Sequence, residues 1–244
     1  MNIHAIIQAR TGSSRLPKKV IKKICDKTVL SHVLERIKQS RFIDDIIVAT
    51  TTHSRDDVIE HEAKNNNVLI FRGSENDVLA RYYYAAKENN SDIILRITSD
   101  CPLIDPNVAD IIIEFYLKNE FDVVTNAGND ISNRTYPRGL DVEVFAFKKL
   151  EEAFLNAKEK YQREHVTPYI YEKTSKVYYY CNKVDYSNYR WTLDTKEDLH
   201  LITKIYDNFY KGRHDFYFDD IIEFIKQNPQ YANINSHIEQ KKIK

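Results

Sequence analysis

Residues 3–19 read IHAIIQARTGSSRLPKK, an apolar run that breaks into a cationic loop. The run Ile3–Gln8 predicts a buried β-strand. The loop that follows holds one glycine and four basic side chains, at Gly12 and at Arg10, Arg15, Lys18 and Lys19. Glycine lets backbone amides approach a ligand closely, and arginine and lysine supply positive charge. The stretch therefore predicts a strand that leads directly into an anion-binding loop.

The same loop has a simpler interpretation as a solvated basic turn, which is the usual fate of a charge run. It matches neither a Walker A motif nor GxGxxG, because it has one glycine and no GK[ST]. Its position favours an anion site, since ligands of open α/β sheets bind beyond the carboxyl ends of the strands.

Strand-like and helix-like segments alternate through the first half of the chain. Further strands are expected at Ile46–Thr50, Val68–Phe71, Ile93–Thr98 and Asp122–Thr125. The segments between them carry apolar residues three and four positions apart, as helices do. Repeated strand-then-helix order predicts a mostly parallel sheet covered by helices on both faces. We therefore predict an α/β fold of three layers, an αβα sandwich.

The second half is less regular. A polar loop at 126–139 precedes an alternating strand at 140–147. Helices are expected at 148–158, 162–172, 196–210 and 219–227, and strands at 176–182 and 189–193. We predict one domain over residues 1–244, in which a subdomain at about 126–186 is inserted before the last core strand.

Composition limits the possible classes of function. The 244 residues include 36 Lys and Arg and 36 Asp and Glu, so the net charge gives no argument for nucleic acid or for an anionic membrane. No apolar run approaches the ~20 residues of a membrane span. Three widely spaced cysteines, Cys25, Cys101 and Cys181, indicate reduced thiols. We expect a cytoplasmic protein that binds neither nucleic acid nor membrane.

Two aspartates follow predicted strands. Asp100 lies in SDCPLIDP after the strand at 93–98, and Asp194 lies in RWTLDTKEDL at the end of the strand at 189–193. A carboxylate at such a place can bind Mg²⁺, which takes one or two protein carboxylates alongside phosphate oxygens. Asp100 could equally be a helix cap or turn residue. Thr195 is placed to cap the next helix, whose acids Glu197 and Asp198 then complement its dipole.

The segment IIQARTGSSRLPKK resembles the nucleotide-binding signature of the SpsF-like cytidylyltransferases of spore-coat polysaccharide synthesis, which are related to CMP-KDO and CMP-acylneuraminate synthetases. In that family a loop of the form R-x-G-S-x-R-L-P-x-K wraps the triphosphate of CTP. The resemblance implies a Rossmann-like nucleotidyltransferase fold of the nucleotide-diphospho-sugar transferase type. It assigns nucleotide binding to Gln8, Ala9, Arg10, Thr11, Gly12, Ser13, Arg15 and Lys19. The family usually has glycine where this chain has Lys18.

Two further resemblances extend the nucleotide site. FRGSENDVLARYYYAA, residues 71–86, is similar to the family's segment beside cytosine and ribose, which implicates Arg72, Gly73, Ser74, Asp77 and Arg81. Ser74 could instead cap the next helix, with Asp77 as its capping-box partner. SDCPLIDP and LDTKEDL are similar to the family's GDCPLI and DTPEDL segments. By that resemblance Asp100 and Asp194 bind the catalytic Mg²⁺, and Arg15 and Lys19 complete the catalytic set.

The acceptor is expected near two segments, TYPRGLDVEVF and QREHVTPYIY, that resemble SpsF-family stretches. Arg138, Arg163 and His165 could hold a carboxylate or phosphate, because guanidinium binds either group with two hydrogen bonds. The acids Asp141, Glu143 and Glu164 could accept sugar hydroxyls. Alternatively, Glu143 is a surface residue of an edge strand and His165 is a structural histidine.

The function expected from these residues is Mg²⁺-dependent transfer of CMP from CTP to a sugar acid or a phosphorylated sugar or alditol, with release of pyrophosphate. The sequence leaves open whether the product is CMP-linked or CDP-linked. Related synthetases imply a homodimer. One alternative is a glycosyltransferase that uses a nucleotide-sugar donor, although SDCPLID lacks the Asp-x-Asp spacing of such enzymes. Another is a nucleotide-binding protein without catalytic activity.

Overall fold

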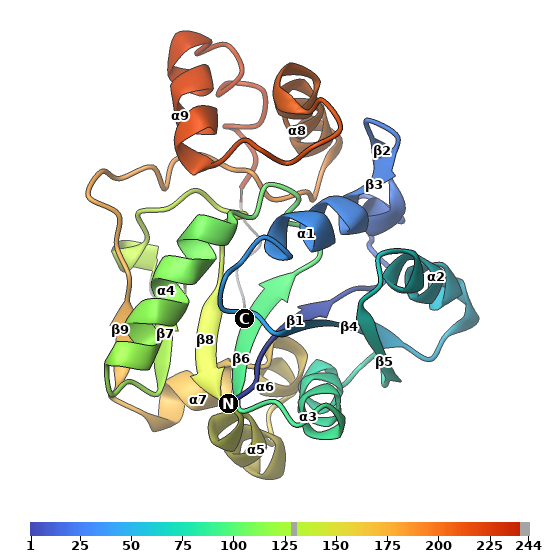
Figure 1. The fold of residues 1–244 in the computed structure, drawn as a ribbon, viewed down its shortest axis with the longest axis vertical. Coiled ribbons are helices and arrows are strands. Elements are labelled where there is room, and N and C mark those ends of the chain that lie inside the picture. Colours follow the sequence, from blue (N-terminus) through green and yellow to red (C-terminus); the bar gives the residue numbers. More distant parts are fainter. Residues whose placement is uncertain (128–130, 240–244) are drawn as a thin grey trace.

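A mixed sheet forms the centre of the structure, a computed structural model that describes residues 1–127 and 131–239. Its seven strands run in the order β5-β4-β1-β6-β8-β7-β9 (Figure 1). Their bounds are β1 Ile3–Gln8, β4 Asp45–Thr51, β5 Leu69–Gly73, β6 Ile93–Thr98, β7 Val123–Thr125, β8 Glu143–Ala146 and β9 Val177–Tyr179. A separate hairpin pairs β2 Lys23–Ile24 with β3 Lys27–Thr28.

The first four strands are parallel, as the sequence predicts. β1 pairs in parallel with both β4 and β6, and β4 pairs in parallel with β5. Parallel strands end at the same edge of a sheet, so the loops after β1, β4, β5 and β6 share one edge. β8 is antiparallel to both β6 and β7.

Helices cover both faces of the sheet. They are α1 Val29–Ile37, α2 Asp57–Asn65, α3 Val78–Glu88, α4 Pro106–Lys118, α5 Phe147–Asn156, α6 Lys160–His165, α7 Pro168–Lys173, α8 Lys196–Phe209 and α9 Phe218–Gln227. Short 3-10 turns occupy Lys19–Ile21, Ser54–Asp56 and Ile131–Asn133.

Alternation along β1 separates two cores. Ala5 and Ile7 join the core with α1, α2, α4, α8 and α9, whereas Ile6 joins the core with α3, α5 and α7. This is the burial expected for a strand covered on both faces. The three-layer αβα prediction is therefore confirmed, and the last two helices lie together at one end of the molecule (Figure 1).

Two predicted elements are wrong. The segment 189–193 is not a strand of the sheet, because its backbone pairs with loops: Trp191 N donates to Arg138 O at 2.6 Å and Leu193 N to Asp100 O at 2.7 Å. The helix predicted at 162–172 is two helices, α6 and α7. Val166 breaks it with a φ of 73°, a conformation that costs a β-branched residue free energy.

The segment 126–186, expected as an inserted subdomain, contributes directly to the main sheet. Its strand β8 lies between β6 and β7, and its strand β9 is the edge strand beside β7. Residues 128–130 of the predicted polar loop lie outside the described residues. Cys25, Cys101 and Cys181 are free thiols, and no helix within the described ranges is long and apolar enough to cross a membrane.

Candidate active site

The loop after β1 is held in place by a buried carboxylate. The backbone N–H and hydroxyl of Thr11 donate to Asp56 Oδ1 at 2.8 and 2.6 Å, and Thr51 donates to the other oxygen. Burial raises the pKa of Asp56, but these hydrogen bonds outweigh burial and leave the pKa below its usual value. Asp56 thus fixes the loop against the end of β4. The sequence pattern did not single it out.

Lys18 has a backbone conformation that favours glycine, the residue that the resemblance led us to expect at this position. Its φ and ψ are 56° and 30°, in the left-handed region, immediately before the 3-10 turn that begins at Lys19. A side chain with a Cβ costs roughly 1–2 kcal/mol in that conformation, which glycine adopts freely. Lys18 therefore keeps the loop's path at some cost in free energy.

Lys19 brings the two predicted metal ligands together. Its Nζ lies 2.6 Å from Asp100 Oδ2 and 2.7 Å from Asp194 Oδ1. Burial lowers the pKa of Lys19, but the two carboxylates outweigh burial and raise it. Burial raises the pKa of Asp100, and the neighbouring ammonium outweighs it and holds that pKa low. A single cation thus bridges carboxylates that are 94 positions apart in the sequence.

Asp194 also contacts two arginines. Arg15 Nη2 lies 2.8 Å and Arg190 Nη2 lies 3.0 Å from Asp194 Oδ2. Of the predicted catalytic residues, Arg15, Lys19, Asp100 and Asp194 therefore form one connected ion-pair network. Asp100 is not the cap of the next helix, because Asp105 caps α4 through the N–H groups of Asn107 and Val108.

Asp198 does more than complement a helix dipole. It forms a capping box with Thr195 at the start of α8, as predicted for Thr195, but its side chain is fully buried. Its Oδ1 accepts from Arg190 Nε at 2.9 Å and from Asn235 Nδ2 at 2.8 Å. Arg190 therefore links Asp198 to Asp194. The sequence pattern indicated no role for Asn235, nor for Arg190, although Arg190 begins the stretch RWTLDTKEDL that contains Asp194.

The donor set at Asp100 and Asp194 fits a magnesium ion. Both carboxylates reach the same cationic atom, so one cation can contact both, and Mg²⁺ usually binds one or two protein carboxylates together with phosphate oxygens. Among residues 1–127 and 131–239, no group of three or more His, Cys, Asp and Glu residues could hold a metal. A metal here therefore needs oxygens from a ligand as well.

In the segment 71–86, the predicted nucleotide-binding residues Arg72 and Asp77 make contacts within the protein. Arg72 donates to Thr51 O at 2.9 Å and pairs with Glu60 and Asp57, so it ties β4 and β5 to α2. Asp77, not Ser74, caps α3, because its Oδ1 accepts from Ala80 N at 2.9 Å. The Ser74 hydroxyl accepts from Asp77 N at 3.3 Å.

Residues predicted for the nucleotide and for the acceptor meet at Asp77. Arg163, an acceptor candidate, donates to Asp77 Oδ2 at 2.9 and 2.6 Å. His165 is the last residue of α6, close to Arg163 in the sequence, and Glu164 between them is exposed. Arg163 already binds a carboxylate of the protein, so any acceptor contact would have to share or replace that pair.

Glu143 is buried, not a surface residue of an edge strand. Its side chain pairs with Arg96 and its Oε1 accepts from Thr167 Oγ1 at 3.0 Å and from Tyr171 OH at 2.6 Å. These contacts engage both carboxylate oxygens. Glu143 therefore ties β8 to β6 and α7.

Arg138 lies beside the network of Asp194. Its backbone pairs with Tyr189 and Trp191, and it forms a parallel bridge with Arg190. Gly139 allows this approach, because its φ is 103° and a Cβ there would lie 2.5 Å from Trp191 C. Burial, and then the neighbouring Arg134, lower the pKa of Arg138.

Arg134 is a residue that sequence reasoning missed. Its guanidinium binds the predicted Asp141 with two hydrogen bonds, of 2.6 and 2.9 Å. In the described part of the chain no carboxylate forms an ion pair with Arg138, which leaves an excess of positive charge here.

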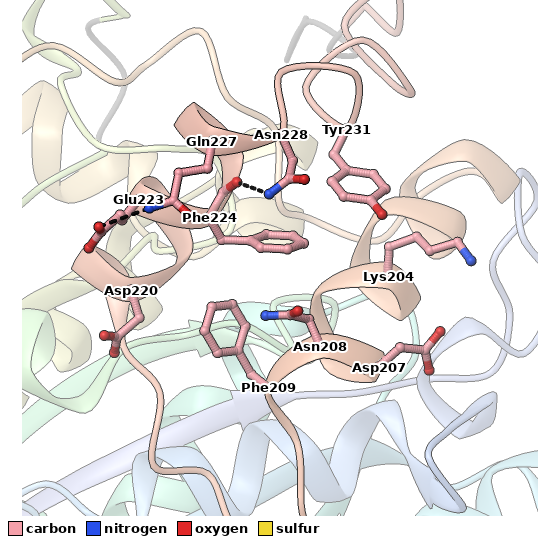
Figure 2. A pocket seen from close by; sticks show the side chains of 10 residues that line it. All are labelled: Lys204, Asp207, Asn208, Phe209, Asp220, Glu223, Phe224, Gln227, Asn228 and Tyr231. Atoms are coloured by element: carbon pink, nitrogen blue, oxygen red, sulfur yellow. Dashed lines mark hydrogen bonds between the residues drawn. The ribbon is translucent and has the colours of Figure 1, made fainter.

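A pocket of about 710 Å³ lies elsewhere, between α8 and α9 (Figure 2). Phe209 and Phe224 belong to its lining and pack edge to face, with their ring centroids 5.5 Å apart. Its lining includes none of the predicted site residues. The convergence of Lys19, Asp100 and Asp194, rather than this pocket, therefore defines the candidate active site.

Comparison with known proteins identifies the class of enzyme to which the chain belongs. A family model described as a cytidylyltransferase matches residues 4–243. The chain belongs to the cytidylyltransferase family. It is therefore a nucleotidyltransferase enzyme, as the resemblance of its first loop implied.

Relatives and a solved structure match almost the whole chain. The chain is 45% identical to an uncharacterized protein of Methanocaldococcus jannaschii, over 99% of this chain and 97% of that one. It is 29% identical to the spore coat polysaccharide biosynthesis protein SpsF of Bacillus subtilis, over 93% and 95%. A solved cytidylyltransferase from Leptospira borgpetersenii is 39% identical, covers 99% of this chain and 100% of its own, and superposes with a TM-score of 0.89.

Proposed function

We propose that this cytidylyltransferase transfers CMP from CTP to a small acidic acceptor in the presence of Mg²⁺, with release of pyrophosphate. The contact that carries the proposal is the Lys19 ammonium between Asp100 and Asp194, 2.6 and 2.7 Å from their oxygens. It places a cation and two metal-type carboxylates at the mouth of the loop after β1. A triphosphate with its metal needs both kinds of group.

The basic and the acidic residues of the site would have different roles. Lys19 and Arg15 would neutralise phosphate oxygens, while Asp100 and Asp194 would hold Mg²⁺, which supplies further charge neutralisation when bound. An acceptor oxygen forms a bond to the α-phosphorus, the bond from that phosphorus to the bridging oxygen breaks, and pyrophosphate leaves with the electron pair. Catalysis of this type depends on positioning and electrostatics, so it needs no covalent nucleophile from the protein.

The charge around Arg138 supports an acidic acceptor. Arg134, Arg138 and Arg190 gather beside the Asp194 network, and Asp141 and Asp198 balance Arg134 and Arg190. Arg138 is thus suited to a carboxylate or phosphate of the acceptor, because guanidinium binds both with paired hydrogen bonds. The similarity to SpsF supports a sugar of surface polysaccharide synthesis. A homodimer and a cytoplasmic location remain predictions.

The test is a pyrophosphate-release assay. The protein is incubated with each nucleoside triphosphate, with Mg²⁺ or with a chelator, and with sugar acids, sugar phosphates and alditol phosphates. We expect release with CTP, Mg²⁺ and one acidic acceptor class, and loss of release on Asp100→Asn. Arg41→Ala is the matched control, since Arg41 is an exposed arginine that pairs with Asp110 and contacts none of the described site residues.

Two outcomes would contradict the proposal. Sugar transfer from a nucleotide-sugar donor without pyrophosphate release would identify a glycosyltransferase. Binding of CTP with no turnover across the whole acceptor panel would identify a nucleotide-binding protein without this activity.

A further inference from the structure

Three basic side chains surround one carboxylate beside Gly12. Arg10 comes from the loop after β1, His53 and Arg55 follow β4, and Glu75 follows β5. Glu75 Oε1 lies 3.4 Å from Arg10 Nη1 and also contacts Arg55 Nη2, and Glu75 Oε2 lies 2.9 Å from His53 Nε2. One acid therefore takes contacts from all three basic groups at the ligand edge of the sheet.

The Glu75 carboxylate is more deeply buried than the three basic side chains around it. Glu75 is 19% exposed, whereas Arg10, His53 and Arg55 are 46%, 55% and 49% exposed. The carboxylate lies inside the cluster, and about half of each basic side chain is exposed to solvent. Because one negative charge faces two guanidinium groups and an imidazole, the cluster keeps net positive charge. It can therefore attract a further anion.

The backbone of the loop runs directly against this cluster. A Cβ placed on Gly12 would lie 3.3 Å from both Arg55 Nη2 and Glu75 Oε1. Such a separation is tighter than ordinary contact, so glycine leaves space beside the carboxylate that other residues would fill. The close approach that glycine permits is the feature expected where a loop wraps an anion.

The cations are held in position before any ligand arrives. Asp56 binds the N–H and hydroxyl of Thr11, which is next to Arg10, and Asp56 itself follows Arg55 in the chain. The Thr11 hydroxyl also lies 3.5 Å from Arg55 O. Because Asp56 is fully buried, it fixes the two arginine-bearing segments relative to each other. Preorganised donors bind an anion with less ordering cost.

A fourth guanidinium lies close by with unused donors. Arg81 is 2% exposed, and within the described residues no acceptor reaches its Nε or Nη1. Burial lowers the pKa of Arg81, and the nearby charge of Arg10 lowers it as well, whereas the charge of Glu75 opposes both. A buried guanidinium with orphaned N–H groups is costly unless an anion or acceptor satisfies it.

We propose that Arg10, His53 and Arg55 form a second anion subsite for the terminal phosphates of the nucleotide, and that Glu75 fills it as an internal counter-ion until they bind. The inference rests on the proposed function, because it names where the leaving end of CTP is held. The same subsite takes free pyrophosphate after transfer. Glu75 and a phosphate compete for the same cations, so binding turns the carboxylate out of the cluster.

The test compares three probes on the full-length protein by calorimetry: CTP, CMP and inorganic pyrophosphate. CMP lacks the terminal phosphates. We expect Arg55→Ala to weaken CTP and pyrophosphate by roughly tenfold while CMP affinity stays unchanged, since a charge-assisted hydrogen bond is lost. His53→Ala should act in the same direction. Glu75→Gln should tighten CTP and pyrophosphate and leave CMP unchanged.

Arg41→Ala serves as the matched control, and thermal melting confirms that each variant is folded. The proposal is overturned if Arg55→Ala and His53→Ala leave pyrophosphate affinity unchanged, or if they weaken CMP as much as CTP. It is also overturned if Glu75→Gln weakens CTP, because Glu75 would then be a ligand of the nucleotide. If pyrophosphate binding depends on Arg55 but CTP does not bind, the subsite stands and the proposed function fails.

Discussion

The ammonium of Lys19 joins Asp100 and Asp194, with Nζ 2.6 Å from one carboxylate and 2.7 Å from the other. We predict that Lys19→Ala lowers the rate of pyrophosphate release by at least about 100-fold, because the phosphates lose a cation and two carboxylates face each other without one. Lys23→Ala is the control, since Lys23 is an exposed lysine nearby. If the folded Lys19 variant released pyrophosphate at an unchanged rate, Lys19 would not be part of the active site.

Lys18→Gly should stabilise the protein by up to about 1 kcal/mol, because glycine removes left-handed strain at φ 56° but adds freedom to the unfolded chain. Urea denaturation measures the change. Lys22→Gly is the matched control, since Lys22 has a φ of −65° and gains nothing from glycine. CTP affinity should stay the same in Lys18→Gly, and a drop would mean that Lys18 contacts phosphate.

Gly139→Ala should destabilise the protein far more than Gly212→Ala. Both glycines have positive φ, 103° and 89°, so the backbone strain of alanine is similar. A Cβ at position 139 would also lie 2.5 Å from the Trp191 backbone, whereas at 212 it meets nothing within 4 Å. We expect a loss of about 3 kcal/mol or more at 139 and about 1 kcal/mol at 212 in denaturant titrations. Equal losses would contradict the close packing of Gly139.

Acid should destabilise the protein through a buried histidine pair. His32 Nδ1 and His214 Nε2 lie 2.8 Å apart. Burial lowers the pKa of His32 from 6.5 to about 4, and burial and the neighbouring His32 lower that of His214 to about 3. These histidines bind protons more tightly in the unfolded chain than in the folded protein. Their contribution to the free energy of unfolding is therefore at its maximum above pH 6.5 and falls as the pH drops toward 4.

The contribution of His32 alone is on the order of 3 kcal/mol across this window. Urea midpoints measured between about pH 7 and about pH 4.5 should decline, and His32→Gln should flatten the decline even though it lowers stability overall. His61→Gln, at an exposed histidine, should leave the slope unchanged. A slope that His32→Gln does not alter would assign the acid sensitivity to other groups.

Local pattern predicted much of this molecule. The bounds of β1 and β6 agree with the predicted strands, and Thr195 caps α8. The predictions were wrong where the conformation of one segment depends on its contacts with another. The alternating residues 189–193 look like a strand, yet their burial comes from loops around Arg138 and Asp100. The helical period of 162–172 continues through Val166, where the backbone turns.

The sequence by itself determined the αβα class, the loop after β1 and the position of Asp100 just past β6, because period, glycine placement and strand-end position are local properties. Only the tertiary structure decided which charges meet. Lys19 with Asp100 and Asp194, Asp198 with Arg190 and Asn235, and Glu75 with Arg10, His53 and Arg55 are contacts across loops. Ion pairs depend on distance in space, and parallel strands ending at one edge create that proximity from residues far apart in the chain.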